Sequence, residues 1–517
     1  MGRQLDTRAL SGLTERDRAL FAGYGVGPAV RLPHRRVQDA IGAVARRWPE
    51  ALAVTHRGER LTYRELDRRA NALAHELVAR GVRPGDRVGL LLRRSVPMVV
   101  GILAILKAGA AYVPQDARIT PPGHLAHIVA AAGTDVVLTL AEFTDRVPDG
   151  PAVIALDRFD GVADHGPVVR PAADDTAVVI FTSGTTGRPN GVRVTHTNLC
   201  NVLLAGPASL GIRPGQRVAQ LLNIAFDMAA WEILGALTHG ATLVVRGADI
   251  EETARAADVV IATPSVLAGL DARRCRGVRT VAVAGERCPQ TLADTWAAFS
   301  AFHNSCGPTE VTIVNTLERY RPGRELTIGR PLPNTTVYVL DELLRPCPIG
   351  QVGEMWAGGL CVTAGYLGND ELTAERYRPD PFLGGAHRMF RTRDLGRWTA
   401  SGELQHHGRT DDQVKVRGGF RVELDAVTGA MERTPGVRRA TTALRDGELV
   451  AFVTPAGVDR GLVTATVAAA LPYYCVPSLV VPVDELPVTD RGKVDRRRLL
   501  ATLDAPSSPV ALVGAVA

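Results

Sequence analysis

The segment Thr182–Gly191, TSGTTGRPNG, has the composition of a loop that binds an anion. It follows a short apolar run, Ala177–Phe181, so it leaves the end of a predicted strand. Its glycines let the backbone approach a ligand closely, and its hydroxyl side chains add donors to the backbone N–H groups that a triphosphate needs. It is not a Walker loop, because no GK[ST] follows. The same composition also occurs in exposed turns, so the loop alone leaves both interpretations open.

Short, continuous apolar runs predict the strands that would position this loop, because unbroken apolar strands are typical of sheets covered on both faces. Helical patterns lie between them. Thr62 and Glu65 form a capping box ahead of one helix, and Gly81 is placed to end it. A second helix would begin near Ser95 and stop before Gly109. This alternation predicts doubly wound α/β layers. The predicted strands are Val88–Leu92, Val136–Leu140, Ala177–Phe181, Val218–Leu222, Val259–Thr263 and Val281–Ala284.

The character of the chain changes near residue 408, where GRTDDQVKVRGGFRVEL is charged and glycine-rich and favours short strands and turns. A later run, Leu449–Val453, predicts one more strand. We therefore expect an α/β protein with a large N-terminal domain of doubly wound sheets and a small, mobile C-terminal α+β domain. The expected parts are an N-terminal extension (1–33), the large domain (34–407), the small domain (408–504) and a flexible tail (505–517).

The composition is that of an ordinary globular protein. The net charge of +6 is small for 517 residues, and no Lys/Arg block occurs, which argues against nucleic acid as a partner. The cysteine count of seven is odd and no CxxC occurs, which argues against a disulfide framework and structural zinc. The N-terminus is polar and no apolar run reaches the ~18 residues that span a bilayer. We expect a soluble, cytoplasmic protein without a membrane partner.

Together with the phosphate loop, further motifs resemble those of adenylate-forming enzymes: acyl-CoA synthetases, luciferases and the adenylation domains of nonribosomal peptide synthetases. The resemblance is strongest to the last group, whose motif order the chain follows from about residue 40 to about residue 500. So many motifs in one order are a very specific signal. They are LTYREL (61–66), LKAGAAYVPQD (106–116), FDMAAWE (226–232), NSCGPTE (304–310), GEMWAGGLCVTAGYL (353–367), ELTAERYRPDPF (371–382), FRTRDL (390–395), GRTDDQVKVRGGFRVEL (408–424) and GKVDRRRL (492–499).

The resemblance implies attack of a substrate carboxylate on the α-phosphorus of ATP, which gives an acyl-adenylate and pyrophosphate. It implies that Glu310 holds Mg²⁺ and that Thr309 contacts the α-phosphate. Asp394 would bind the ribose hydroxyls, assisted by Arg409. Lys493 would bridge the substrate carboxylate and the α-phosphate. Catalytic roles thus fall to Lys493, Thr309 and Glu310, and the other nucleotide-binding candidates are Thr182, Ser183, Gly184, Thr185, Thr186, Gly187, Asn190, Cys306 and Gly307.

The resemblance also implies a second step. In the family, the small domain then rotates about a hinge, which Asp411 occupies here, and Gly418 and Gly419 would face the incoming pantetheine arm. No GGxS serine motif of a carrier domain follows the last motif. The expected acceptor is therefore a phosphopantetheinyl carrier protein supplied in trans, and a small activator protein is a further candidate partner.

Three positions depart from the family pattern. Asn190 replaces a lysine in the phosphate loop and supplies no charge. Cys306 replaces the aromatic residue that stacks on adenine. Arg393 replaces the glycine before the ribose-binding aspartate, which adds a charge or forces a different turn. Each change is expected to weaken ATP binding.

Asp227 in the FDMAAWE motif points to an amino acid as substrate. In the family this aspartate pairs with the α-ammonium, and a buried carboxylate without a cation is costly. A structural or helix-capping aspartate is the alternative. Trp231 would form a flat apolar wall of the pocket, which favours a bulky apolar or aromatic amino acid. The substrate-binding candidates are Phe226, Asp227, Met228, Trp231, Ser265, Ala282, Ala284, Ser305, Ile313 and Val314.

Two other functions remain open from the sequence. The first is an acyl-CoA or aryl-acid ligase of the same superfamily, against which Asp227 and the peptide-synthetase motifs argue. The second is a degenerate, non-catalytic binding module, which Asn190, Cys306 and Arg393 suggest.

Overall fold

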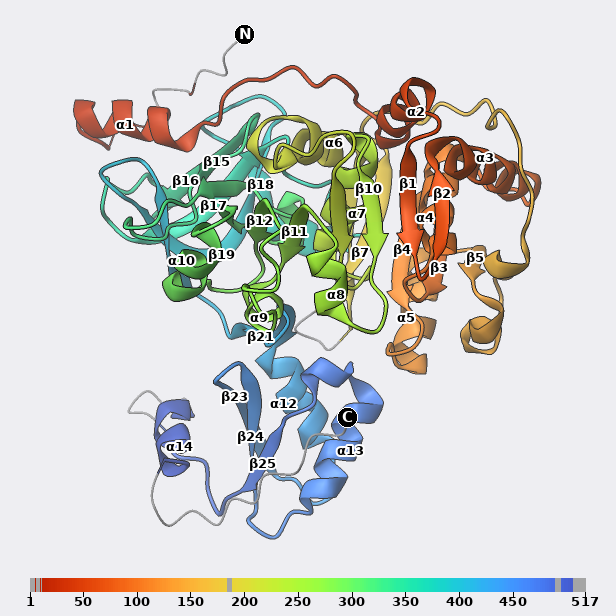
Figure 1. Ribbon diagram of the computed structural model, residues 1–517. Coiled ribbons are helices and arrows are strands. Elements are labelled where there is room, and N and C mark those ends of the chain that lie inside the picture. The colour runs from red at the N-terminus through yellow and green to blue at the C-terminus, as the bar shows by residue number, and fades with distance from the viewer. Residues whose placement is uncertain (1–4, 6–9, 11, 184–187, 489–493, 505–517) are drawn as a thin grey trace. The chain divides into compact units, whose positions relative to one another are not determined.

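The structure is a computed structural model that describes residues 5, 10, 12–183, 188–488 and 494–504. The chain divides into two compact units (Figure 1). Unit 1 contains residues 1–118, 129–181 and 191–410, and unit 2 contains 119–128, 182–190 and the chain from Asp411 onward. The last division lies between Thr410 and Asp411, whereas the two short segments of unit 2 lie within the stretch that the sequence assigns to the large domain.

The largest sheet of unit 1 has a parallel centre and antiparallel edges. Its central strands are buried almost throughout, as expected for apolar strands covered on both faces. From edge to edge its nine strands are β15 (Arg330–Pro331), β14 (Thr316–Arg319), β13 (Ala301–Cys306), β12 (Thr280–Val283), β11 (Val259–Ala262), β9 (Arg217–Gln220), β10 (Thr242–Val245), β1 (Leu52–His56) and β2 (Glu59–Thr62).

Unit 1 has two further sheets. One has six strands in the order β6 (Ala152–Ala155), β5 (Val136–Thr139), β3 (Arg87–Leu92), β4 (Ala111–Asp116), β7 (Thr176–Thr182) and β8 (Asn190–Thr195), and its pairs from β6 to β7 are parallel. The other is antiparallel and contains β16 (Thr335–Leu340), β17 (Gly353–Gly359), β19 (Arg388–Trp398), β18 (Tyr377–Pro379) and β20 (Leu404–Arg409). Each of the six apolar runs identified in the sequence contains a strand, although β9 ends at Gln220 and leaves Leu221 and Leu222 outside it.

The helices confirm the predicted start signals. Thr62 and Glu65 form the capping box of α3, and Gly81 follows its end with a φ of 92°. Ser95 caps α4 through its side chain. Figure 1 shows α7 lying along β10. The helices before Asp411 are α1 (Glu15–Gly25), α2 (Val37–Arg47), α3 (Tyr63–Ala79), α4 (Val96–Lys107), α5 (Pro122–Ala132), α6 (His196–Leu204), α7 (Asp227–Thr238), α8 (Ile250–Arg255), α9 (Pro264–Ala268), α10 (Gln290–Ala297) and α11 (Asp370–Arg376).

From Asp411 onward the chain is α+β, as the sequence predicts. Val427 and Met431 of one helix pack with Val463 and Val467 of another over the sheet. The elements are β21 (Gln413–Val416), β22 (Phe420–Glu423), α12 (Leu424–Glu432), β23 (Arg439–Arg445), β24 (Glu448–Thr454), α13 (Arg460–Ala470), β25 (Leu479–Pro482) and α14 (Arg496–Thr502).

Part of the stretch that the sequence sets apart as an extension belongs to unit 1. Phe21 of α1 is completely buried and stacks on Tyr338 of β16, with ring centroids 5.8 Å apart. Burial of an aromatic ring of this size stabilises a helix on its sheet by a few kcal/mol, about 3 in typical cases. The helix is therefore part of the core of this unit.

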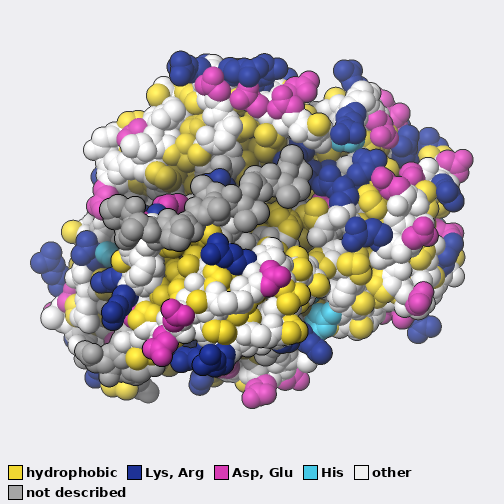
Figure 2. Space-filling model, turned by 90° about the horizontal axis from the view of Figure 1, so that it is seen from below, with side chains coloured by type: hydrophobic (Ala, Val, Ile, Leu, Met, Phe, Trp, Pro, Cys, Tyr) yellow, Lys and Arg dark blue, Asp and Glu magenta, His cyan; other side chains and the backbone are white. Residues whose placement is uncertain are grey.

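The surface carries both signs of charge. On the face drawn in Figure 2, basic side chains lie among acidic ones. Within the described ranges, all seven cysteines are free thiols, and no helix has the length and apolar character that crossing a bilayer requires.

Candidate active site

Most substrate candidates follow the carboxyl ends of four neighbouring parallel strands, so they lie on the same side of the nine-stranded sheet. In such sheets this side is where ligands bind. The strands β9, β11, β12 and β13 are adjacent and parallel. After them come, in turn, Phe226 to Trp231 on α7, Ser265 on α9, Ala284, and the segment from Cys306 to Val314.

Asp227 is the first residue of α7, and Phe226 is its N-cap without a side-chain cap bond. The aspartate is thus not the cap of this helix, which was one part of the alternative interpretation; a structural role for Asp227 is not tested by its position. The residue lies in the first turn of the helix, where the helix dipole stabilises negative charge. Asp227 and Phe226 are partly buried, whereas Met228 is 7% exposed.

Trp231 is completely buried, and its indole Nε1 donates to the carbonyl oxygen of Ala208 at 2.7 Å. Burial and this hydrogen bond fix the orientation of the indole ring. Ser265 is bound through its backbone N–H and its hydroxyl to Oε2 of Glu286, at 2.9 and 2.6 Å. A Cβ at Gly285 would contact the sulfur of Met228 at 3.6 Å, so Met228 points toward the loop after β12. Ala282 and Ala284 are buried on and just after that strand.

The GPTE motif forms a tight turn after β13. Gly307 is required there, because a Cβ would lie 2.6 Å from Cα of Val314. Thr312 and Ile313 have left-handed φ values of 61° and 69°, which is strained for β-branched residues. Ser305 and Val314 are buried on either side of the turn.

Within this turn, Thr309 begins a 3₁₀ segment, Thr309–Val311, that contains Glu310. Glu310 is completely buried, and its Oε1 accepts the hydroxyl of Tyr366 at 2.8 Å. Tyr366 packs edge-on against Tyr377, whose own hydroxyl bonds to Thr363 at 2.7 Å. Tyr366 thus binds the predicted metal ligand directly, and Tyr377 packs against Tyr366.

Asp394 and Arg409 meet across the antiparallel strands β19 and β20. Nη1 of Arg409 donates to Oδ1 of Asp394 at 2.6 Å, and Asp394 is 7% exposed. His406, on the same strand as Arg409, brings Nε2 within 3.3 Å of the same oxygen. The structure therefore brings together the predicted ribose-binding pair and adds a histidine.

Arg393 has a left-handed φ of 61°, in the region that glycine adopts most easily. Its Nη2 lies 2.8 Å from Oε1 of Glu375. The charge added at this position is therefore directed to an acidic side chain of α11.

The phosphate loop is described only at its ends. The hydroxyl of Thr182 donates to the carbonyl of Asn190 at 3.4 Å, and Oγ of Ser183 donates to the carbonyl of Arg421 at 3.0 Å. Gly184, Thr185, Thr186, Gly187 and Lys493 lie outside the described residues. Cys306 is partly exposed at the end of β13, and Asp411 is the residue at which unit 2 resumes.

Four supporting residues were not identified from the sequence: Tyr366, His406, Glu286 and Glu232. Tyr366 lies in the motif GEMWAGGLCVTAGYL and Glu232 in FDMAAWE, so the family motifs could have identified both residues. His406 lies outside these motifs, and only the pairing of β19 with β20 reveals its neighbour.

Residues 42–367 match the family model of AMP-binding enzymes. Adenylate-forming reductase 03009 of Coprinopsis cinerea is 48% identical over 501 residues, which cover 95% of this chain and 49% of that protein. Phosphinothricin tripeptide synthetase PhsC of Streptomyces viridochromogenes is 38% identical over 491 residues, covering 90% and 45%. The chain thus spans about half the length of these curated relatives.

Among solved structures, holo-PA1221, an NRPS protein containing adenylation and PCP domains, superposes with a TM-score of 0.83 at 26% identity and covers 94% of this chain and 86% of that one. The family resemblance and the α/β fold expected from the sequence are both confirmed. The chain belongs to the AMP-binding enzyme family, within the adenylate-forming superfamily.

Proposed function

We propose that this protein uses ATP and Mg²⁺ to activate an α-amino acid and transfers it to the thiol of a separate phosphopantetheinyl carrier protein. In the first step, the substrate carboxylate attacks the α-phosphorus, the bond to pyrophosphate breaks and an aminoacyl adenylate forms. In the second, the carrier thiol loses its proton and attacks the carbonyl carbon, and AMP leaves as the thioester forms. The proposed substrate has a bulky apolar or aromatic side chain.

The observation that carries the amino-acid proposal is Asp227 at the start of α7, on the ligand-binding side of the sheet. A partly buried carboxylate gains most from a cationic partner that comes with the ligand. The α-ammonium of an amino acid is such a partner. Peptide synthetases, which are among the relatives, are named for joining amino acids.

Nucleotide binding rests on Asp394, Arg409 and Glu310. The Asp394 carboxylate suits ribose hydroxyls as donors, and Arg409 holds it in place. Mg²⁺ usually binds one or two carboxylates together with substrate phosphates. Glu310, a completely buried carboxylate in the turn after β13, is the residue that we propose for that role. Mg²⁺ would neutralise charge on the phosphates, and Lys493 would supply a further cation.

Pyrophosphate exchange into ATP tests the proposal. The panel should pair each amino acid with its des-amino acid. Exchange that prefers an amino acid over its des-amino partner supports the proposal, and thioester formation on an added holo-carrier protein supports the second step. Exchange with aryl or hydroxy acids alone would favour an aryl-acid ligase. Folded protein without exchange for any acid would favour a non-catalytic module.

A second candidate is activation of an acid for reduction. Two fungal adenylate-forming reductases match at 48% and 46% identity, above the 38% of the peptide synthetases. The adenylate and the carrier thioester would form in the same way. Hydride from NADPH would then add to the thioester carbonyl carbon, the carbon–sulfur bond would break, and the carrier thiol would leave as the aldehyde forms. Mass spectrometry of reactions with ATP, a holo-carrier and NADPH separates the two: aldehyde favours this candidate, and an accumulating thioester favours transfer.

A further inference from the structure

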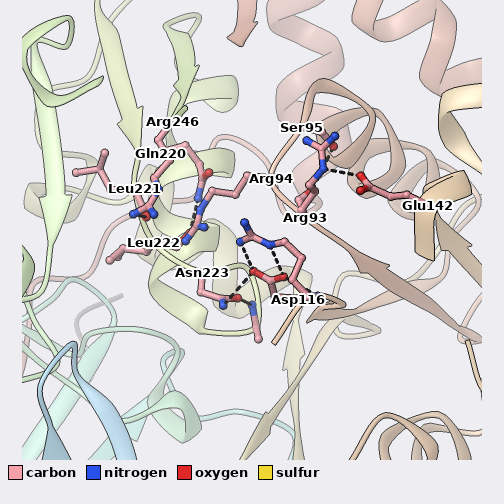
Figure 3. A network of polar contacts seen from close by, with 12 residues as sticks. Arg93, Arg94, Ser95, Asp116, Glu142, Gln220, Leu221, Leu222, Asn223 and Arg246 are labelled. Carbon is pink, nitrogen blue, oxygen red and sulfur yellow. Dashed lines mark hydrogen bonds and ion pairs between the residues drawn. The ribbon is translucent and has the colours of Figure 1, made fainter. Parts of the chain in front are cut away.

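The main-chain polar groups of the segment Leu221–Leu222, between β9 and α7, all bind side chains that are buried or half-buried. Figure 3 shows Arg94, Gln220 and Arg246 around this segment. Glu232 Oε1 accepts both N–H groups, at 2.7 Å from Leu221 and 3.2 Å from Leu222. The Leu221 carbonyl accepts Nη1 of Arg246 at 3.3 Å, and the Leu222 carbonyl accepts Nε of Arg94 at 3.0 Å. No regular secondary structure satisfies these groups, so the side chains set the path of the segment.

These side chains come from distant parts of the sequence. Arg94 follows β3, Arg246 follows β10, and Glu232 lies on α7 itself. Gln220, the last residue of β9, joins them by donating to the Leu222 carbonyl at 2.6 Å and to Oε2 of Glu232 at 3.2 Å. The clamp, defined as Arg94, Gln220, Glu232 and Arg246, therefore ties the segment to three neighbouring elements.

Asn223 extends the restraint toward α7. Its Oδ1 accepts the N–H of Ala225 at 3.0 Å, and its carbonyl accepts the N–H of Phe226 at 3.1 Å. Its Nδ2 lies 3.5 Å from Oδ2 of the buried Asp116, which Arg118 binds at 2.7 Å (Figure 3). The main chain is thus fixed from the end of β9 up to the residue that precedes Asp227.

Stability alone does not explain this arrangement. Glu232 is completely buried, and burial lowers the pKa of Arg94 to about 10, with repulsion from Arg246 in the same direction. Buried ionic groups are often no more stabilising than apolar residues of the same volume. What these hydrogen-bonding side chains do provide is a defined geometry for the loop that leads to Asp227.

We infer that Glu232, Arg94 and Arg246 are positioning residues for substrate recognition: they hold the β9–α7 connection so that the Asp227 carboxylate meets the α-ammonium of the amino acid. The inference rests on the proposed function of Asp227. A misplacement of about 1 Å from a distant mutation can cost ~100-fold in rate, so loosening the clamp is expected to reduce the preference for the amino group.

The test measures the ratio of kcat/KM for the amino acid to kcat/KM for its des-amino acid, by pyrophosphate exchange. Because both values scale with the amount of folded enzyme, loss of stability alone leaves the ratio unchanged. Glu232→Gln keeps the shape but replaces one accepting oxygen by an amide nitrogen that cannot accept, and Arg94→Lys keeps the charge but removes the Nε–H donor. Both should lower the ratio, by about 10- to 100-fold.

Arg93→Lys is the matched control. It is the adjacent arginine, and its Nε binds Glu142 at 2.6 Å, away from the segment (Figure 3). Its ratio should stay at the wild-type value. If Glu232→Gln does not fold, Arg246→Lys, which alters one 3.3 Å contact of the segment, replaces it.

Asp227→Ala separates the two hypotheses. If it lowers the ratio while Glu232→Gln and Arg94→Lys leave it unchanged, the positioning role is wrong and the proposed function stands. If Asp227→Ala itself leaves the ratio unchanged, the amino-acid proposal is wrong. A lowered ratio in Arg93→Lys would also overturn the inference, because the effect would not be specific to the clamp.

Discussion

Glu232 and Glu310 are both completely buried, yet their carboxylates meet different donors. Glu232 binds main-chain N–H groups of Leu221 and Leu222, whereas Glu310 binds the hydroxyl of Tyr366. A main-chain amide cannot leave its acceptor unless the loop moves, but a hydroxyl can rotate toward another acceptor. The first arrangement suits a carboxylate that holds a protein segment. The second suits one that a ligand shares.

The difference also follows from position along the sheet. Glu232 lies on α7, one turn beyond Asp227, and reaches back to the end of β9. Glu310 lies in the strained turn that follows β13. Burial alone does not distinguish the two glutamates. The identity of their donors separates the proposed positioning role of Glu232 from the proposed role of Glu310 in the chemistry.

The largest effect is expected from Glu310→Gln. If this carboxylate acts on the nucleotide through Mg²⁺, its loss should lower kcat about 10²- to 10³-fold, as for other electrostatic groups at a reacting centre. The loss should be equal for the amino acid and its des-amino acid, because both react at the same phosphorus. Pyrophosphate exchange with both substrates measures it. If Glu310→Gln lowered activity with the amino acid alone, Glu310 would act on recognition of the amino group, as proposed for Glu232, and the contrast between the two glutamates would be wrong.

Tyr366→Phe should have a smaller effect on the same chemistry. It removes only the hydroxyl that binds Glu310, and a hydrogen bond to a charged group is worth ~1.5–3 kcal/mol. The Mg²⁺ concentration for half-maximal exchange should therefore rise by roughly 10- to 100-fold.

Tyr377→Phe is the control for that experiment, because this buried neighbour bonds to Thr363 instead. Its Mg²⁺ dependence should match the wild type. Binding of a fluorescent ATP analogue in EDTA should be the same in all three proteins. Equal shifts in both tyrosine variants would mean that ring packing, and not the bond to Glu310, governs the site.

Glu232 should make stability depend on pH. Burial raises its pKa from 4.5 to about 8, against its hydrogen bonds from Leu221 and Leu222 and the charge of Arg94. A carboxyl with a raised folded pKa contributes most below pH 4.5 and loses this contribution as pH rises through 8. Relative to Glu232→Gln, the wild type should therefore lose about 3 kcal/mol between pH 5.5 and 8.5.

Thermal unfolding of both proteins at the two pH values checks this expectation. The comparison with the glutamine variant cancels the titration of the histidines, since these are common to both chains. A difference in midpoint that stays constant with pH would show that Glu232 is ionised throughout, as an ion pair with Arg94 would require.

The fold was predictable from local patterns because its strands are continuous apolar runs and its helices carry caps. Val259–Thr263 and the Thr62–Glu65 box needed no partner to be recognised. The site was predictable only where family motifs name a residue, as for Asp394. His406 and Arg94 were not, because their contacts join residues 12 and 128 positions apart, and such distances carry no local signal.

The same limit explains the departures. The sequence indicated that Arg393 adds a charge or changes the turn, and the partner of that charge could not be predicted. The structure shows a left-handed backbone at Arg393 and pairs its charge with Glu375. The effect of Arg393 on ATP binding can be tested by replacing it with glycine.

Arg393→Gly is expected to have the smallest effect. Glycine removes the strain of a larger residue in the left-handed region, which should raise the free energy of unfolding by about 1–2 kcal/mol. It also increases the conformational entropy of the unfolded chain, which should lower the free energy of unfolding by roughly 0.5–1 kcal/mol. It also deletes a pair with side chains 26% and 46% exposed, which is worth at most ~1 kcal/mol at such exposure. The terms nearly cancel, so thermal stability should stay within about 1 kcal/mol of wild type.

Since the guanidinium is directed to Glu375, the KM for ATP should change less than about threefold, or ~0.7 kcal/mol. A larger drop in KM, measured by exchange at saturating amino acid, would mean that Arg393 weakens the ribose site despite its pair with Glu375.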